Sequence, residues 1–193
     1  MPFDTRRFLR NLLVAFVPAV LVWLVVTPFY NRFLLAAGEN VVHLTESPDV
    51  TELLPAARDH HHGLITRRDF PPSRRLTHTF RVTDLHFHLV LLGALFLAVP
   101  GVLLRKRLAD LGVAALVSVF FHLVLVLFWV QFVYATQLGA WSAENYGAFG
   151  QNFWGLGKHL LDLPFKLALP FVLWAAFHLD RLLPRRHREP NAP

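Results

Sequence analysis

The sequence predicts an all-α membrane protein with four transmembrane helices and a small extracytoplasmic α/β insertion. We expect that insertion to hold a short helix and a two- or three-stranded antiparallel piece. The composition is strongly apolar, since 54% of the 193 residues are hydrophobic, only 17% are charged, and the mean hydropathy is +0.42. The apolar residues form long blocks, and about 20 such residues cross the hydrocarbon core of a bilayer. Basic clusters flank these blocks, as they do in membrane proteins.

The first apolar block covers residues 12–29 and carries no charge. Pro18 lies inside it, but membrane helices tolerate proline where neighbouring groups satisfy the freed carbonyl. A basic start followed by an apolar block also fits a cleaved signal peptide. The residues that follow Trp23 are bulky where signal cleavage requires small ones, so we interpret the block as a retained membrane anchor.

Three further blocks follow, at residues 85–104, 111–138 and 160–183. The second is followed directly by basic residues, and the third carries aromatic residues near its far end. The fourth is the most interrupted by polar residues and prolines, yet it has Trp154 before it and arginines after it. We therefore predict a span in each block.

The basic clusters predict the orientation, because Lys and Arg in short segments are retained on the cytoplasmic side. Four spans place all three clusters on one side, so we expect an inner-membrane protein with both termini cytoplasmic. The loop at residues 139–152 contains Glu144 but no Lys or Arg, as an outside loop should. The clusters are Arg6, Arg7 and Arg10; Arg105, Lys106 and Arg107; and Arg181, Arg185, Arg186 and Arg188. These predictions divide the chain into four parts. Residues 1–29 hold the cytoplasmic N-terminus and the first span, 30–84 the extracytoplasmic segment, 85–183 the other three spans, and 184–193 the basic cytoplasmic tail.

The extracytoplasmic segment has its own pattern. Residues 30–44 carry an apolar stripe of helical period, which predicts a continuation of the first span, an interfacial helix, or a helix packed on a small domain. Residues 50–55, 63–70 and 75–84 predict strands, the last two around a turn at residues 71–73. So few strands are not stable alone, so they must pack on the membrane helices or on a partner.

Eleven histidines are present. His60, His61 and His62 are adjacent, and in a strand they would face opposite ways, so at most two of them could share a metal ion. Because no nearby carboxylate other than Asp59 is available, we expect a solvated loop there. His86 and His88 stand two apart at the predicted membrane entry. On a helix they would face roughly opposite directions, as amphipathic side chains at the headgroup level without a required function.

His122 lies deep inside the third predicted span, with Ser118 one turn before it. An ionisable group at that depth must face protein or water. The functional interpretations are a proton relay or a ligand for a pigment, haem or metal. The preferred interpretation is a neutral histidine that is hydrogen-bonded between helices.

A polar cluster marks the start of the fourth span. Lys158, Asp162 and Lys166 are four residues apart and share one helical face, so Asp162 can pair with either lysine. The prolines nearby suggest a kinked helix lining a polar cavity. His159 and Glu144 complete the candidate outward-facing cluster, although an interfacial ion pair would explain the same residues.

Several kinds of chemistry are missing from the sequence. The absence of cysteine excludes a thiol nucleophile and thiolate metal sites, and no phosphate loop or hydrolase motif is present. We predict no cofactor and no metal, and an enzyme is less favoured than a non-catalytic protein. The net charge of +6 is explained by membrane topology rather than by nucleic-acid binding.

The layout resembles small membrane proteins associated with exosortases, especially the exosortase H-associated type. The similar features are a first span ending in Trp23 and Pro28-Phe29-Tyr30-Asn31, an outside segment, and three spans of which the second contains the sequence HLVLLGALFLAVP, residues 88–100. The resemblance implies an accessory role in processing or exporting surface proteins. Exosortases resemble cysteine transpeptidases, so a chain without cysteine is not the sorting enzyme itself.

Two hypotheses follow. In the leading one, the chain is a non-catalytic accessory protein that contacts the lipid bilayer and a membrane-protein partner or a second copy of itself. In the alternative, a small membrane enzyme or carrier binds an anionic lipid-linked substrate at the cluster of Glu144, Lys158, His159, Asp162 and Lys166.

Overall fold

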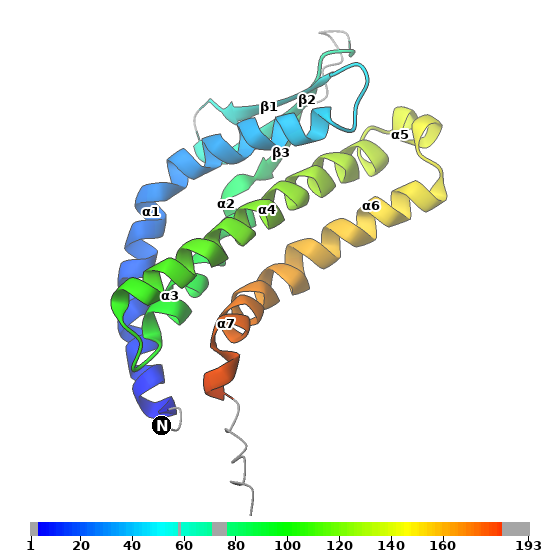
Figure 1. The fold of residues 1–193 in the computed structure, drawn as a ribbon. Helices are drawn as coiled ribbons and strands as arrows, with labels where there is room; N and C mark the ends of the chain where they lie inside the picture. The colour runs from blue at the N-terminus through cyan, green and yellow to red at the C-terminus, as the bar shows by residue number, and fades with distance from the viewer. Residues whose placement is uncertain (1–3, 58, 71–76, 183–193) are drawn as a thin grey trace, which may run out of the picture.

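The computed structural model describes residues 4–57, 59–70 and 77–182. Long helices run side by side, and a small sheet covers one end of them (Figure 1). The start of the chain and the end of the last helix lie at the opposite end, which we call the terminal end. The predicted turn at 71–73 and the tail 184–193 fall outside the described residues.

Helix α1 spans Thr5–His43 without a break. The side chain of Asp4 caps its first turn by accepting a hydrogen bond from the backbone N–H of Arg7, at 2.9 Å. Pro18 and Pro28 both lie inside the helix. Residues 30–43 continue the helix of the first predicted span, and they also pack on the sheet, so the first and third of the three expected outcomes are both observed.

The second predicted span is shorter than expected. Helix α2 covers Val82–His86 and α3 covers Leu89–Ala98, and the helical path ends there rather than at residue 104. Pro100 and Gly101 form the turn that follows, and Gly101 adopts φ +71, a conformation that favours glycine. Helix α4 then runs over Leu104–Thr136.

The last helices form one continuous path. After α5 (Ala140–Asn145), α6 (Ala148–Leu160) leads through a π-helical turn, η2 (Leu161–Phe165), into α7 (Lys166–Leu182). Pro164 lies inside the π turn, where the widened backbone accommodates a residue that lacks an N–H. Pro164 thus coincides with a local widening and Pro170 lies within α7, and neither proline interrupts the helical path.

The sheet is antiparallel in the order β1–β2–β3, formed by β1 (Thr51–Ala56), β2 (Asp59–Arg67) and β3 (His78–Arg81). The predicted three-stranded piece is confirmed, although its last strand is shorter because α2 begins at Val82. The three adjacent histidines lie in β2, so the prediction of a loop there was wrong. Pairing with β1 and β3 extends the strand to His62 and beyond.

One apolar core joins the sheet to the helices. Leu53, Ile65 and Phe80 from the three strands pack with Leu34 of α1 and Val126 of α4. Glycine permits the close approach: a Cβ at Gly63 would lie 2.7 Å from Leu35 of α1, and a Cβ at Gly38 would lie 2.6 Å from Val126. The sheet is thus packed directly on the ends of α1 and α4.

Among the described residues, three helices are long and apolar enough to cross a membrane: Thr5–His43, Leu104–Thr136 and Ala148–Leu179. The segment Val82–Ala98 is apolar but shorter. Large apolar side chains stand exposed along these helices, for example Leu13, Val25 and Phe29 at 75%, 71% and 71% exposure. Such continuous apolar surface favours a lipid environment over water.

Candidate functional site

A network of hydrogen bonds centres on Asn31, a buried residue of α1 that is only 2% exposed. Its side-chain Nδ2 donates to the backbone carbonyl of His60 in β2 at 2.6 Å and to the hydroxyl of Thr83 in α2 at 3.0 Å. Its Oδ1 lies 2.6 Å from Nε2 of His86. One amide side chain therefore connects α1, the sheet and α2.

The hydrogen bonds of His86 fix its tautomer. Trp23 Nε1, which can only donate, lies 3.0 Å from His86 Nδ1, so Nδ1 is the acceptor. Nε2 then carries the proton and donates it to Asn31 Oδ1. Both ring nitrogens are satisfied in the neutral form, which makes His86 a link between α1 and α2.

The network continues from Thr83 to the exposed start of β2. The Thr83 hydroxyl accepts from Asn31 and lies 3.0 Å from Nδ1 of His61, so it can donate onward. Asp59 accepts from the backbone N–H of His61 at 2.8 Å and bonds Nδ1 of His62 at 2.6 Å. The backbone hydrogen bond from His61, followed by the contact with His62, lowers the pKa of the Asp59 carboxyl.

Three buried histidines converge where α1, α4 and the α2–α3 junction meet. The ring centroids of His88 and His122 are 4.9 Å apart, and those of His86 and His122 are 6.3 Å apart. His86, His88 and His122 are 1%, 4% and 0% exposed. The expectation that His86 and His88 face opposite ways at the headgroup level was wrong, because both rings contact His122 from a turn between two helices.

The hydrogen bonding of His122 agrees with the preferred interpretation. Its Nδ1 lies 2.7 Å from the hydroxyl of Tyr30, which joins α4 to α1. Ser118 does not take part, because its hydroxyl donates to the carbonyl of Ala114 in its own helix at 2.9 Å. Within the described chain, His122 Nε2 and both ring nitrogens of His88 have no hydrogen-bond partner.

These nitrogens could exchange protons or hold a small polar molecule. However, no group of three or more His, Asp or Glu side chains in the described ranges is arranged to hold a metal ion. Leu92 and Phe96 of α3 form a separate buried apolar cluster with Ala114 of α4.

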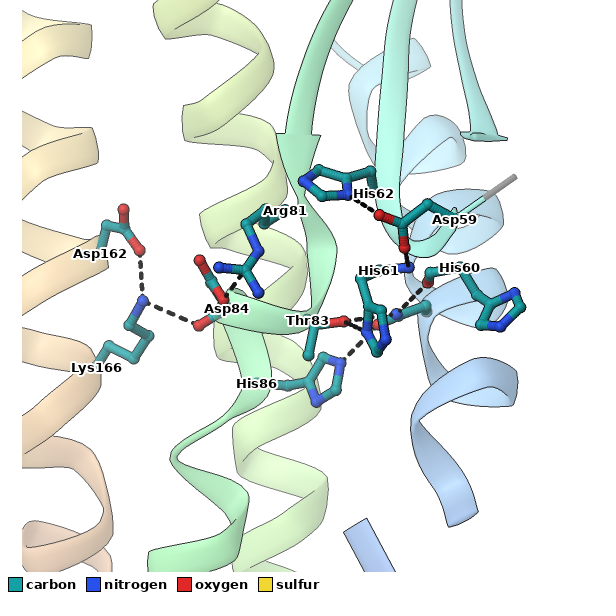
Figure 2. A network of polar contacts seen from close by, with 11 residues as sticks. Asp59, His60, His61, His62, Arg81, Thr83, Asp84, His86, Asp162 and Lys166 are labelled. Atoms are coloured by element: carbon teal, nitrogen blue, oxygen red, sulfur yellow. Dashed lines mark hydrogen bonds and ion pairs between the residues drawn. The ribbon is translucent and has the colours of Figure 1, made fainter. Parts of the chain in front are cut away.

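The structure brings together Lys158, Asp162 and Lys166, as their spacing predicts. The Asp162 carboxylate lies 3.3 Å from Lys158 Nζ and 2.6 Å from Lys166 Nζ. Lys158 is buried and lies 3.8 Å from the centre of the Trp129 ring, a cation–π contact with α4. Lys166 also donates to the carbonyl of Asp84 in α2 at 3.0 Å (Figure 2).

The other two residues of the predicted cluster stand apart from these ion pairs. His159 is exposed, and its ring packs edge-on against Phe132 at 5.7 Å between centroids. Glu144 is exposed on α5, and no hydrogen bond or ion pair joins it to another residue of the described chain. The connected part of the cluster is therefore limited to Lys158, Asp162 and Lys166.

Helix α2 is consequently held by polar contacts on two sides, and we call this set of contacts the clamp around α2. Asn31 and Trp23 hold it to α1, and Lys166 holds it to α7. Sequence reasoning missed Asn31, Trp23 and Thr83 as members of this clamp. The signal available in the sequence was the position of Asn31, two residues after the first apolar block. A polar side chain at the boundary of an apolar span requires hydrogen-bond partners.

No protein-family model matches the chain, and no curated protein or solved structure matches it either.

Proposed function

We propose that the protein is a non-catalytic accessory protein of the inner membrane, with four spans and both termini in the cytoplasm. Its sheet would form a rigid platform on the outer surface that binds a partner membrane enzyme. The observation that carries this proposal is the clamp around α2. Its polar side chains are engaged within the fold: Asn31 joins α1 to the sheet and to α2, and Lys166 joins α7 to α2.

The topology is supported by the positions of the basic residues. The chain start and the α3–α4 turn, where Arg105 to Arg107 follow, lie toward the terminal end, away from the sheet (Figure 1). Retention of Arg and Lys would keep this end in the cytoplasm. Helices α2 and α3 together cover the 17 residues Val82–Ala98, which would extend over about 25 Å, so this proposed span would require local thinning of the bilayer.

The two edges of the sheet are not equivalent. The edge of β1 is covered by acidic residues at the end of α1: Glu39 accepts the N–H of Leu53 at 2.8 Å, and Glu46 accepts that of Thr51 at 3.1 Å. Among the described residues, no side chain is bonded to the outer edge of β3. An uncovered edge is a template for an added strand. We therefore assign β3 as the contact for an extended segment of the partner.

The partner class follows from the resemblance in layout to exosortase-associated proteins. The proposed partner is an exosortase-type enzyme in the same membrane. The alternative, an enzyme or carrier that binds an anionic lipid-linked substrate at Lys158, Asp162 and Lys166, is less well supported. Asp162 already neutralises one of the two lysines, and Lys166 also bonds Asp84, so a substrate would have to displace existing contacts.

Site-directed cross-linking tests the proposal cleanly because the chain has no cysteine. Thr79→Cys on exposed β3, labelled with a maleimide photo-cross-linker in membranes, should form an adduct with a tagged exosortase-type partner. Leu103→Cys, at the opposite end and 81% exposed, is the control and should form none. No adduct from Thr79→Cys, together with purification as a lone monomer, would refute the accessory role.

A further inference from the structure

A cavity of about 210 Å³ lies between α1 and the connection from β1 to β2. Its walls are largely apolar, and its polar groups come from one side of α1 and from the start of β2. It is partly open to the surroundings, which distinguishes it from the closed histidine cluster. The lining residues are Pro28, Asn31, Arg32, Leu35, Pro55, Ala56, Ala57 and His60.

Among the described residues that line this cavity, the formal charge comes from Arg32. Its side chain is exposed, and within the described chain no carboxylate pairs with it and no hydrogen bond is formed by it. His60 provides an exposed imidazole on the other wall. Asp59, the neighbour of His60 in the chain, is engaged by His61 and His62, and Glu39, seven residues after Arg32, accepts the N–H of Leu53. The cavity therefore offers a guanidinium without an anionic partner.

The position of Arg32 along α1 places it at the level of the outer headgroups, on the proposed topology. About 20 helical residues, counted from the end of the basic cluster at Arg10, span the ~30 Å hydrocarbon core and reach Tyr30. Below the cavity, the surface of α1 is apolar, with Val25 and Phe29 each 71% exposed. A lipid lying along this surface would bring its phosphate to Arg32.

We propose that this cavity binds the headgroup of an anionic phospholipid of the outer leaflet. The guanidinium of Arg32 donates to the phosphate oxygens in the fork geometry that arginine favours for phosphate. The apolar walls from Pro28, Leu35 and Pro55 pack on the glycerol and the first acyl carbons. This site lies on α1 and is separate from the ion pairs of α6 and α7. It relies on the proposed topology for one point, the placement of Arg32 at the level of the outer headgroups.

Native mass spectrometry of the full chain, released from micelles with phosphatidylglycerol or phosphatidylcholine, tests the proposal. The wild type should retain phosphatidylglycerol at least fivefold more than phosphatidylcholine. Arg32→Gln should abolish this preference. Arg81→Gln, which removes another exposed arginine on the same end of the molecule, is the matched control and should keep it. Equal retention of the two lipids by wild type, or unchanged preference in Arg32→Gln, would overturn the proposal.

A second variant keeps the charge and fills the cavity. Ala57→Phe should lose the preference for phosphatidylglycerol over phosphatidylcholine although Arg32 remains. An unchanged preference in this variant would show that the lipid binds outside the cavity and would refute the site. Inorganic phosphate should compete weakly, because it lacks the apolar part. Competition as strong as that of the lipid would also refute it. The purified protein is used without a partner, so these results are independent of the cross-linking experiment.

Discussion

The amide oxygen of Asn31 and Nε2 of His86 lie 2.6 Å apart although 55 residues separate them in the chain. Both side chains are buried, at 2% and 1% exposure. The contact joins the part of α1 that lies near the sheet to α2, the short helix that leads from the sheet into the next apolar segment. The same amide side chain also bonds the His60 carbonyl of β2, so Asn31 links α1 to both α2 and the sheet.

Removing this link should destabilise the fold. Asn31→Leu removes the acceptor for Nε2 of buried His86 and the side-chain donor to the His60 carbonyl, and each unsatisfied group costs about 1–3 kcal/mol. We expect a loss of about 2–4 kcal/mol in the free energy of unfolding, measured by denaturant titration in detergent. Asn40→Leu is the control, since Asn40 is exposed on the same helix and bonds only the Ala36 carbonyl. Equal losses in both variants would contradict the role given to Asn31.

Close packing of the sheet on α1 gives a second prediction. Gly63→Ala adds a methyl group that would meet Leu35 at 2.7 Å and both Phe80 and Val82 at 2.9 Å, so neighbouring side chains must move. We expect a loss of about 1–3 kcal/mol in thermal unfolding experiments. Gly112→Ala in α4, where a Cβ meets nothing within 4 Å, should be neutral or stabilising by up to about 1 kcal/mol.

The ion pairs of α6 and α7 should depend most on their shared carboxylate. Asp162→Asn removes the partner of both Lys158 and Lys166, and buried Lys158 is left with its contact to Trp129. We expect a loss of about 1–3 kcal/mol in stability, larger than that of Lys166→Met. Glu144→Gln should change stability by less than about 0.5 kcal/mol, because this residue is exposed and unpaired in the described chain. A larger loss from Glu144→Gln than from Asp162→Asn would contradict this assignment.

The exposed end of the sheet predicts a pH dependence. Hydrogen bonds from Arg67, at 2.7 and 3.0 Å, hold the pKa of the Asp69 carboxyl below its ordinary value. A carboxyl whose pKa is lower in the folded state stabilises the fold above its unfolded pKa and loses this contribution as pH falls through the folded pKa. Unfolding measured across the acid range should show this loss in wild type and a smaller loss in Asp69→Asn. Identical acid profiles would exclude the pair as a source of stability.

The sequence predicted the elements better than the contacts between them. Helical spacing was sufficient for Lys158, Asp162 and Lys166, because partners four residues apart meet on any helix. The burial of His86 and His88 was missed, since it depends on the α2–α3 turn and on α4 packing against it. Asn31 and Thr83 could not be paired from the sequence, because their contact spans 52 residues and follows no local period.

The end of the second span was misplaced for a related reason. Apolar residues continue past Ala98 to residue 104, so hydropathy gave no boundary. The turn at Pro100 and Gly101 ends the helix, since proline lacks an N–H and Gly101 adopts a positive φ. The continuation of α1 to His43 was predictable as a helix from its apolar stripe, but its packing against the sheet required the tertiary structure.

Labelling of single cysteines with a membrane-impermeant maleimide in intact cells tests the central claim most directly. Leu54→Cys on β1 is 45% exposed, and Thr5→Cys is exposed at the start of α1. We predict that Leu54→Cys is labelled in intact cells and that Thr5→Cys is labelled only after the membrane is opened. Labelling of both positions in intact cells, or of neither, would contradict a sheet held on the outer surface by helices that begin in the cytoplasm.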